Sequence, residues 1–554
     1  MFNSIAVILS LLIAAAWVYS IFARSRFLIH MLQLEGYRNN NFSKWIKDFS
    51  KRAYPQHLHV GTFLAIFTAI LSGILYSNFG SEEVYYVGII LWSLFIIYGG
   101  VTKKEKSKVE LNITDRVRRL IRTHILVNLV IAILIIVIVG KVICSMIIGT
   151  DYTVAIVLAV SAIAIFLQPR ILMLSNKINK PIEENINKKY FVQAQEKVRS
   201  IDGLEIVGIT GSYGKTSTKF LTATILSEKF KTLKTPESYN TPMGVSLVIN
   251  RDLDPSYEVF VAEMGARNIG DIAEMGDLVG HNIGIITSVG PAHLETFKNI
   301  ENIMNTKYEI IEKLPEDGIA IFNYDNKYVK ELSDRTKKFK KINYGIKEKD
   351  VDVYAKDIKV SATGSEFILG TKDGKEVECS SKLLGEHNIL NLLAGASAGL
   401  ALGMSLEEIA RGISKVEPVP HRLQLMNPGT GIIIIDDAFN SNPDGAKAAL
   451  DVISKFEGGR KIVITPGMIE LGDSEFEENK EFGRNIAKTC DFAILVGEDR
   501  AVPIKAGIEE AGFPKESIFI ARNLDRATEI LGQLARPGDV VLFENDLPDN
   551  YNEK

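Results

Sequence analysis

The distribution of apolar residues along the chain is the feature that most restricts its fold. Five apolar runs lie in the first third of the 554 residues: Ile5–Phe22, Val60–Tyr76, Val84–Tyr98, Ile125–Ile148 and Tyr152–Leu167. The fourth run is long enough to cross a bilayer, and the others are near the lower limit of about 17 residues. We therefore predict an α-helical membrane domain at 1–170 with about five transmembrane helices. The alternative is that a short run, Val84–Tyr98 above all, is a re-entrant segment or a buried core helix.

Basic residues in the loops between these runs predict an orientation. Lysine and arginine are concentrated between the first and second runs, from Arg24 to Arg52, and between the third and fourth, from Lys103 to Arg122. The intervening loops, "SNFGSEE" and "GTD", contain no basic residue. Because basic loops remain on the cytoplasmic side, we predict a multi-pass protein of the cytoplasmic (inner) membrane, with its N-terminus outside and everything after Arg170 in the cytoplasm. Residues 171–200 form a basic, helix-prone connector, which suits either an anionic leaflet surface or an ordinary solvated helix.

The remainder of the chain has the mixed composition of a soluble enzyme. The net charge of −3 gives no overall basic surface, so no nucleic-acid partner is expected. The three cysteines, Cys144, Cys379 and Cys490, stand far apart, which argues against a zinc ribbon or a disulfide framework. Strands interleaved with helices predict mainly parallel α/β sheets. We expect a P-loop-type central ATPase domain at 201–418 and a Rossmann-like, doubly wound C-terminal domain at 419–554.

The segment "VGITGSYGKTSTKF", residues 207–220, nearly matches the phosphate-binding loop G-x-x-x-x-G-K-[ST]. The first glycine of that pattern would fall at Ile209, whereas glycines occupy positions 208 and 211. An apolar strand precedes the segment and a helical pattern follows it, so its backbone N–H groups and the helix N-terminus can hold phosphate oxygens. Lys215 would reach the β- and γ-phosphates, and Thr216 a Mg²⁺ ion. The nucleotide-binding set expected here is Gly211, Ser212, Gly214, Lys215, Thr216 and Ser217.

Other chemistry-bearing residues follow predicted strands or begin predicted helices. Glu263 ends an apolar strand, where a carboxylate is well placed to hold Mg²⁺ directly or through water. His293 lies in the loop "GPAHLETF", although a single histidine is more often structural than a metal ligand. Asn388 and Asn391 share a helix face and offer a donor and an acceptor to an adenine edge, with helix capping as the alternative. "IIIIDD" is predicted to be a buried strand that ends in two carboxylates.

Taken in order, these motifs resemble those of the Mur ligases, a family of ATP-dependent amide-forming enzymes. The shared patterns are T-G-S-x-G-K-T, E-M-G-A, G-x-A-H-L-E, G-x-H-N-x-x-N and D-D-A-F-N-S-N-P. With "VPHRLQLM" before the last of them and "KIVITPGMIELGDSEFEEN" after it, the series spans about 208–475. E-M-G-A, "NTPMG" and the last pattern are closest to the branch that adds D-alanyl-D-alanine to UDP-N-acetylmuramoyl-tripeptide. The resemblance implies that ATP phosphorylates a carboxylate of the acceptor, and that an amine then attacks the acyl phosphate to give an amide, ADP and phosphate.

The resemblance also implies roles for individual residues. It predicts ATP and two Mg²⁺ ions as cofactors, and it suggests that Lys307 is carbamylated to supply a carboxylate near the metal. The implied catalytic residues are Lys215, His293, Lys307 and Arg422, the last of which would approach the γ-phosphate. The implied metal ligands are Thr216, Glu263, His293 and Lys307. The nucleotide would be contacted by Asn388, Asn391, Arg422 and Asp436, with Asp437, Phe439 and Asn440 closing over it.

Two departures from the family pattern leave the substrate open. The membrane region stands where these ligases normally have a domain that binds a UDP-sugar. The Lys-Gly-Ser-Arg element that usually follows the last strand is replaced by "FENDLPDNYNEK", which contains Glu544, Asp546 and Asp549. An acidic end would suit an amine-bearing partner, although a solvated tail is the slightly favoured interpretation.

The leading hypothesis is a membrane-anchored ligase that joins an amino acid or dipeptide to a UDP- or lipid-linked cell-wall precursor. A second hypothesis is a polymerising ligase similar to the poly-γ-glutamate or cyanophycin synthetases. A third, from a different class, is a membrane transporter or sensor with an energising ATPase, against which the intact His387–Asn391 and Asp436–Pro443 motifs argue. The lipid II-amidating ligase is disfavoured because its zinc-ribbon cysteines are missing. The oligomeric state is not predicted.

Overall fold

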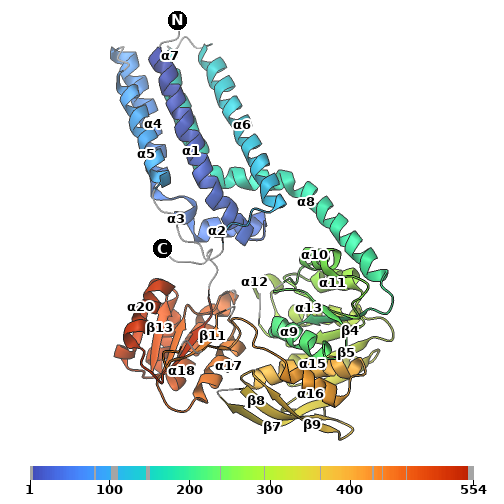
Figure 1. Cartoon of the computed structure of the whole chain (residues 1–554). Helices are drawn as coiled ribbons and strands as arrows, with labels where there is room; N and C mark the ends of the chain where they lie inside the picture. Colours follow the sequence, from blue (N-terminus) through green and yellow to red (C-terminus); the bar gives the residue numbers. More distant parts are fainter. Residues whose placement is uncertain are drawn as a thin grey trace. The chain divides into compact units, whose positions relative to one another are not determined.

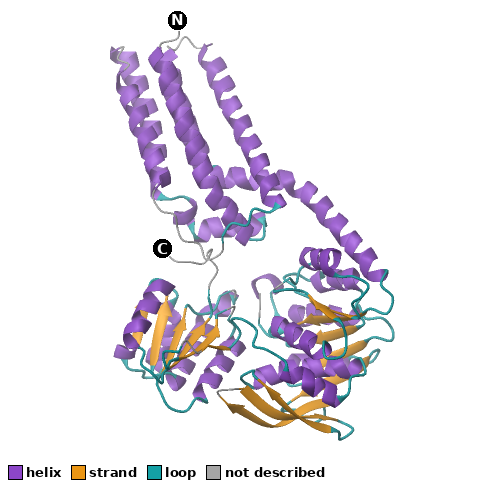
Figure 2. Cartoon of the chain, viewed as in Figure 1, coloured by secondary structure: helices purple, strands orange, loops and turns teal. Residues whose placement is uncertain are grey.

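The computed structural model describes residues 4–79, 83–101, 110–144, 150–237, 239–291, 294–361, 364–426, 429–438, 441–469 and 471–546. The chain divides between Ile186 and Asn187 into two compact units (Figure 1). The first is helical and the second combines helices with two sheets (Figure 2). A helical N-terminal region followed by α/β structure is therefore confirmed.

The helical unit consists of α1 to α7 and the first part of α8. Their bounds are α1 Ser4–Leu34, α2 Asn39–Asp48, α3 Ser50–Ala53, α4 Gln56–Phe79, α5 Glu83–Val101, α6 Asp115–Cys144, α7 Thr150–Phe166 and α8 Gln168–Arg199. Each predicted apolar run falls within one of the long helices, and the last four residues of the fourth run, 145–148, lie outside the described residues. Ala16, Trp92 and Leu158 belong to a common core between α1, α5 and α7.

Within the residues that the structure describes, fewer stretches qualify as membrane spans than the five apolar runs predicted. Among the described residues, the stretches Ile8–Leu34 and Asp115–Val137 meet the length and composition of a span. A third candidate is the pair Ile156–Phe166 and Gln168–Arg199, which is bent by 64°. The shorter apolar stretches are Gln56–Ser72 and Tyr86–Gly99.

The second unit begins with a nine-stranded sheet in the order β2-β3-β1-β4-β5-β6-β7-β8-β9. The strands are β1 Glu205–Thr210, β2 Thr232–Lys234, β3 Val259–Glu263, β4 Ile283–Ile286, β5 Ile319–Asn323, β6 Lys340–Gly345, β7 Val353–Ser361, β8 Gly364–Thr371 and β9 Glu376–Ser381. Pairs from β2 to β7 are parallel, and β7, β8 and β9 pair antiparallel. The central strands are buried on both faces, which explains their continuous apolar sequences.

Eight helices of the described chain accompany this sheet: α9 Lys215–Leu226, α10 Pro242–Asp252, α11 Asp271–Val279, α12 Leu294–Phe297, α13 Ile300–Glu312, α14 Lys327–Arg335, α15 Glu386–Ala401 and α16 Leu406–Ser414. Several begin at the polar residues that favour helix starts. Thr241 caps α10 and Asn299 caps α13, each accepting a backbone N–H, and Ser405 forms a capping box with Glu408 at α16.

A six-stranded sheet follows in the order β10-β11-β15-β12-β13-β14. Its strands are β10 Gln424–Met426, β11 Ile433–Asp437, β12 Lys461–Thr465, β13 Phe492–Val496, β14 Ile518–Ala521 and β15 Val540–Glu544, and its helices are α17 Pro443–Ser454, α18 Glu475–Thr489, α19 Ala501–Glu510 and α20 Leu524–Leu534. Only β10 pairs antiparallel. The last strand of the chain, β15, lies between β11 and β12, which brings the carboxyl ends of these strands together.

Candidate active site

The phosphate-loop segment joins β1 to α9 as predicted from its flanking sequence. Gly214 precedes α9 with φ of 78°, a left-handed conformation that favours glycine. A Cβ atom at Gly214 would also stand only 3.0 Å from Oδ1 of Asn391. Backbone conformation and close approach therefore both require a glycine at this position.

The loop is held by the segment that follows β4. The Ser212 backbone N–H donates to the Ser288 carbonyl oxygen (2.7 Å), and the Ser212 hydroxyl donates to the Gly290 carbonyl oxygen (3.1 Å). The Tyr213 backbone N–H donates to the Ser288 hydroxyl (3.0 Å). Lys215 Nζ donates to the carbonyl oxygens of Gly211 (2.7 Å) and Ser212 (3.1 Å), so the lysine folds over the loop.

Glu263, at the end of β3, accepts hydrogen bonds from three side chains. Thr216 Oγ1 donates to Oε1 (3.1 Å), Asn240 Nδ2 donates to the same oxygen (3.0 Å), and Lys219 Nζ donates to Oε2 (3.1 Å). The structure thus brings together Thr216 and Glu263, two of the four metal ligands implied by the resemblance. A hydroxyl and a carboxylate are oxygen ligands of the kind that Mg²⁺ prefers.

Lys219 is a site residue that the sequence analysis missed. It is fully buried against Glu263, although a lysine on a helix after such a loop is normally solvated. The available signal was its position three residues after Thr216, which places both on one face of α9. Asn240 was noted only as part of the "NTPMG" pattern.

Lys307 is buried on α13, with 3% of its surface exposed. The pKa of Lys307 is lowered to about 7, mainly by burial and next by the positive charge of Lys215, while Asp271 and Glu309 oppose the shift. The carboxylate of Glu309 is itself held by the backbone N–H groups of Gly270 (2.8 Å) and Ala273 (2.9 Å). The amine of Lys307 is therefore partly neutral near physiological pH.

The two asparagines on α15 lie on one face, and they connect this helix to α9. Asn391 Oδ1 accepts from the Thr218 hydroxyl (3.0 Å), and Asn391 Nδ2 donates to Oδ1 of Asn388 (3.4 Å). Asn388 Nδ2 donates in turn to the Leu384 carbonyl oxygen (2.9 Å). Neither asparagine occupies the N-cap position of α15, which is Gly385, so the capping alternative is not realised.

The C-terminal part of the site is built around β10 and the end of β11. Asp436 Oδ2 lies 2.7 Å from Nδ1 of His421, and Asp437 Oδ1 accepts from the Leu423 backbone N–H (3.1 Å). Arg422, between His421 and Leu423, is half-buried, and removal from water lowers its pKa while Asp437, Glu263 and Glu544 oppose the shift. The positive charge of Arg422 therefore interacts with Glu263 on β3 and with Asp437 and Glu544 in the six-stranded sheet. Asp436 also lines a cavity of about 450 Å³.

The structure describes two of the three acidic residues noted near the chain end, Glu544 and Asp546. Glu544 is fully buried, so the interpretation of this end as a solvated tail is wrong for that residue. Asp546 lines the cavity that contains Asp436. Asp549, His293, Phe439 and Asn440 lie outside the described residues.

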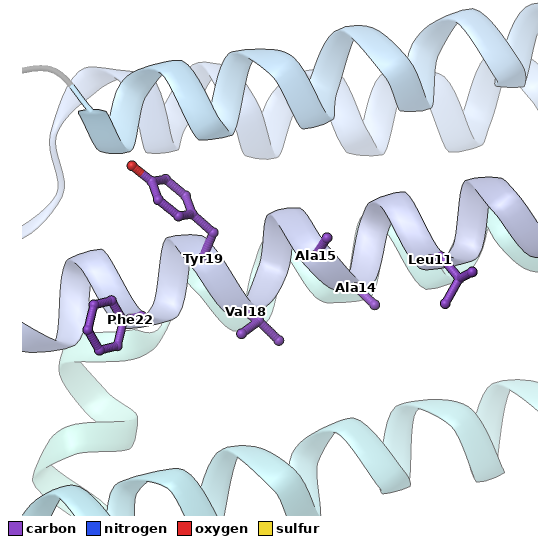
Figure 3. A pocket seen from close by; sticks show the side chains of 6 residues that line it. All are labelled: Leu11, Ala14, Ala15, Val18, Tyr19 and Phe22. Atoms are coloured by element: carbon purple, nitrogen blue, oxygen red, sulfur yellow. The ribbon is translucent and has the colours of Figure 1, made fainter.

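A second cavity shares no residue with these motifs. It has a volume of about 630 Å³ and lies along α1, lined by Leu11, Ala14, Ala15, Val18, Tyr19 and Phe22 (Figure 3). Its lining offers one hydroxyl and no charged group, so it lacks the donors and acceptors that phosphate or amide chemistry requires. The candidate active site is the cluster around β1, β3 and α9.

Comparison with known proteins identifies the family of both sheet domains. The model of the Mur ligase middle domain matches residues 209–399, and that of the Mur ligase, glutamate ligase domain matches 421–544. The UDP-N-acetylmuramoyl-tripeptide–D-alanyl-D-alanine ligase of Mycobacterium leprae is 31% identical over 369 residues, which cover 62% of this chain and 71% of that enzyme. The same ligase of Bacillus subtilis is 30% identical over 345 residues, with 62% and 73% covered.

Solved structures give the same result. MurF from Acinetobacter baumannii has a TM-score of 0.60 at 26% identity and covers 66% of this chain and 78% of its own. MurF ligase from Thermotoga maritima in complex with ADP has a TM-score of 0.59 at 27% identity, with 65% and 80% covered. The chain belongs to the Mur ligase family of ATP-dependent amide-forming ligases.

Proposed function

We propose that this chain is a membrane-anchored ligase that joins D-alanyl-D-alanine, or a related amino acid or dipeptide, to a carboxylate of a UDP- or lipid-linked peptidoglycan precursor. The observation that carries the proposal is the convergence of Lys215, Thr216 and Glu263 at the ends of two adjacent parallel strands. The names of the relatives support the choice of D-alanyl-D-alanine.

The reaction begins with transfer of the γ-phosphoryl group of ATP to the acceptor carboxylate, which gives an acyl phosphate and ADP. The neutral amine attacks the acyl carbon and a new C–N bond forms. The C–O bond to the phosphoryl group then breaks, and the nitrogen loses one proton, which leaves with the phosphate as hydrogen phosphate. The difficulty is that three phosphates and a carboxylate must come together. Lys215 and Arg422 supply positive charge, and their effect is largest as charge shifts in the transition state.

Thr216 and Glu263 are the described residues that we propose hold Mg²⁺, with His293 as a further ligand. When bound, Mg²⁺ would neutralise part of the phosphate charge. The backbone N–H groups of Gly211, Ser212, Gly214 and Ser217 would hold phosphate oxygens at the start of α9. Asn388, Asn391, Asp436 and Asn440 complete the proposed nucleotide site.

We further propose that Lys307 is carbamylated. Only a neutral amine reacts with CO₂, and the buried position of Lys307 beside Lys215 favours its neutral form. The carbamate would turn a second cation near Lys215 into an anion. This exchange removes a repulsion between two buried positive charges and adds an oxygen ligand for the metal.

The proposed membrane anchor rests on the polarity of the helical unit. Leu126, Leu129 and Ile133 on α6 are about half exposed, as expected for side chains that face lipid. Polar side chains in the same helices point inward and bond to each other: Ser25 lies 2.9 Å from His124, and Gln168 donates to Asn128 (2.8 Å). Buried polar pairs beneath an apolar surface are typical of membrane proteins. We propose 1–170 as the membrane domain, 171–200 as the connector, and 201–418 and 419–554 as cytoplasmic ligase domains.

The ligase proposal is tested with the full-length protein in detergent. ADP release would be followed with UDP-muramoyl-tripeptide, lipid-linked precursors or glutamate polymers, each with D-alanyl-D-alanine or free amino acids. Release that needs both an acceptor and an amine, together with a new amide mass, is the expected result. ATP turnover that ignores every acceptor and yields no amide would contradict it.

The membrane proposal is tested separately with native membranes. The protein should stay in the pellet after alkaline carbonate extraction. Protease should remove the ligase domains in inside-out vesicles and spare them in spheroplasts. Extraction by carbonate, or cleavage in spheroplasts, would refute the anchor or its orientation without bearing on the ligase chemistry.

A further inference from the structure

Glu544, the last residue of β15, has a carboxylate that the protein satisfies only in part. Its side chain is fully buried. One oxygen accepts a hydrogen bond from the Ser441 hydroxyl (2.5 Å), whereas Oε2 accepts none from the described part of the chain. A buried carboxylate oxygen without a donor costs free energy, and folded proteins rarely leave one. The position therefore calls for a donor that the described chain does not supply.

A second carboxylate lies beside it. Asp437 on β11 pairs in register with Glu544 on β15, so both side chains lie on the same face of the sheet. Burial raises the pKa of Glu544 to about 8, with the charge of Asp437 as the next cause. Burial likewise raises the pKa of Asp437 to about 6. Ionisation of both acids is unfavourable because their negative charges repel each other. A cation between them would offset this repulsion.

The only cation of the described chain that lowers both pKa values is Arg422. When both acids are ionised, as a bound cation would favour, two carboxylates and one guanidinium carry an excess of one negative charge. In the proposed mechanism Arg422 faces the transferring phosphoryl group, so it cannot also neutralise both acids. A primary ammonium supplies the missing positive charge and three N–H donors, one of which can serve Glu544 Oε2.

Hydrogen bonds around Asn545 hold Glu544 at the carboxyl end of β15. Asn545 adopts φ of 68°, its Nδ2 donates to the Gly467 carbonyl oxygen (2.6 Å), and its Oδ1 accepts from the Ser441 backbone N–H (3.2 Å). These bonds join the loops after β11, β12 and β15. The carboxyl ends of parallel strands are the usual ligand-binding edge of such sheets.

We propose that Glu544 and Asp437 bind the ammonium group of the amine substrate and so help to determine which amines the ligase accepts. Before the nitrogen attacks the acyl phosphate, it gives up one proton, which a carboxylate of this pair accepts. The inference rests on the proposed ligase function and assigns the recognition of its second substrate. In the ligases that this chain resembles, the Lys-Gly-Ser-Arg element usually places a lysine after the last strand. A lysine at this place would repel an ammonium group. The acidic replacement therefore changes what this part of the site can bind.

Calorimetry on the full-length, ADP-loaded protein tests the proposal with D-alanyl-D-alanine and its N-acetyl derivative, which lacks the ammonium. The wild type should bind the free dipeptide at least about tenfold more tightly than the acetylated one, and Glu544→Gln should lose this discrimination. Glu516→Gln, on an exposed residue of the same domain, is the matched control and should keep it. Equal affinities, no binding of either probe, or discrimination that survives in Glu544→Gln would overturn the proposal.

Two further measurements separate the possible failures. ADP binding by each variant reports whether it has folded; if Glu544→Gln does not bind ADP, Asp437→Asn takes its place with the same expectation. Turnover with UDP-muramoyl-tripeptide and D-alanyl-D-alanine is measured in parallel, where Glu544→Gln should raise KM for the dipeptide about tenfold or more and leave KM for ATP unchanged. If the wild type turns over but binds the free and acetylated dipeptides equally, the ammonium site is refuted and the ligase function stands. If it prefers the free dipeptide but shows no turnover, the ligase proposal is refuted and the ammonium site stands.

Discussion

Lys219 and Glu263 form an ion pair closed off from solvent, with 3.1 Å between Nζ and Oε2 and with side-chain exposures of 0% and 1%. Lys219 Nζ also donates to the backbone carbonyl oxygen of Glu237. The carboxylate that we propose holds the metal is thus already neutralised from the side of α9. Removing the lysine would leave a charge in the interior of the domain with no counter-ion.

Lys219→Met should therefore destabilise the ligase domains. Loss of one partner of a buried pair costs about 3–5 kcal/mol, which corresponds to a fall in Tm of roughly 10 °C for a domain of this size. Differential scanning fluorimetry on the detergent-solubilised protein measures the shift. Lys229→Met, which breaks the more exposed pair with Glu408, is the control and should cost about 1 kcal/mol or less. Equal shifts for the two variants would refute the interpretation.

Lys215→Ala should abolish most of the chemistry and spare the fold. In the described part of the chain, Lys215 Nζ donates hydrogen bonds to the loop carbonyl oxygens of Gly211 and Ser212, so its loss leaves the core intact. We expect acceptor-dependent ADP release to fall by about 10²–10³, the effect of removing one group that stabilises transition-state charge. Lys337→Ala, at an exposed lysine of the same domain, should retain full activity. Undiminished ADP release by Lys215→Ala would remove this lysine from the mechanism.

Activity should depend on CO₂ and on pH through Lys307. The pKa of Lys307 is lowered to about 7, so its amine is mainly neutral at pH 8 and mainly protonated at pH 6. Because the neutral form reacts with CO₂, activity at fixed CO₂ should fall as pH decreases through 7. Bicarbonate should restore part of it, and the intact mass should rise by one CO₂.

Lys307→Arg is the control for this dependence, because a guanidinium forms no such carbamate. The activity of this variant should not change when bicarbonate is added. A wild-type enzyme that is equally active in CO₂-depleted and bicarbonate-supplemented buffer would contradict the carbamylation proposal. The mass is measured at neutral pH, because a carbamate is lost in acid.

His281 should make the ligase domains sensitive to acid. Its ring is buried, with 2.6 Å between Nε2 and the Ile310 carbonyl oxygen, and burial lowers the pKa of His281 to about 4. The folded state thus favours the neutral ring, so this contribution is complete above the unfolded pKa of about 6.5 and is lost as pH falls towards 4. The total is about 3 kcal/mol.

The measurement is Tm as a function of pH between 7 and 4 for the wild type and His281→Gln. The variant starts from a lower Tm because it perturbs a packed site, but its Tm should fall less steeply over this range. His421→Gln, which changes an exposed ring, should follow the wild-type slope. Parallel curves for the wild type and His281→Gln would assign the acid sensitivity to other groups.

Much of the architecture could be predicted from the sequence because its signals are local. Apolar runs of 15 or more residues predicted the long helices, and β-branched runs such as "IIIID" predicted strands. The order of the strands was not predictable, since β15 enters the sheet between β11 and β12 over a separation of about a hundred residues. Pairing of that kind depends on the whole domain rather than on any window of sequence.

The residues of the candidate site also divide into those that the sequence predicts and those that it does not. Thr216 and Lys215 follow from the loop pattern, whose geometry is set by neighbours in the chain. Lys219 and Glu544 do not, because a charged residue on a helix or near a chain end is usually solvated. Lys219 is buried against Glu263 of β3, and Glu544 lies in register with Asp437 of β11, so both surroundings come from elements distant in the sequence.

The bond between Thr218 and Asn391 spans 173 residues, and this separation matters while the chain is being made. Gly395 of α15 packs so closely on α9 that a Cβ there would stand 3.1 Å from the Cα of Thr222. At about 5–20 residues per second, a ribosome needs roughly 10–35 s to pass from one helix to the other. Throughout that interval the apolar residues of α9, Leu221 and Ile225 among them, lack the partner that buries them in the finished domain. The nucleotide loop is therefore among the first parts of the domain to leave the ribosome and among the last to reach its final packing.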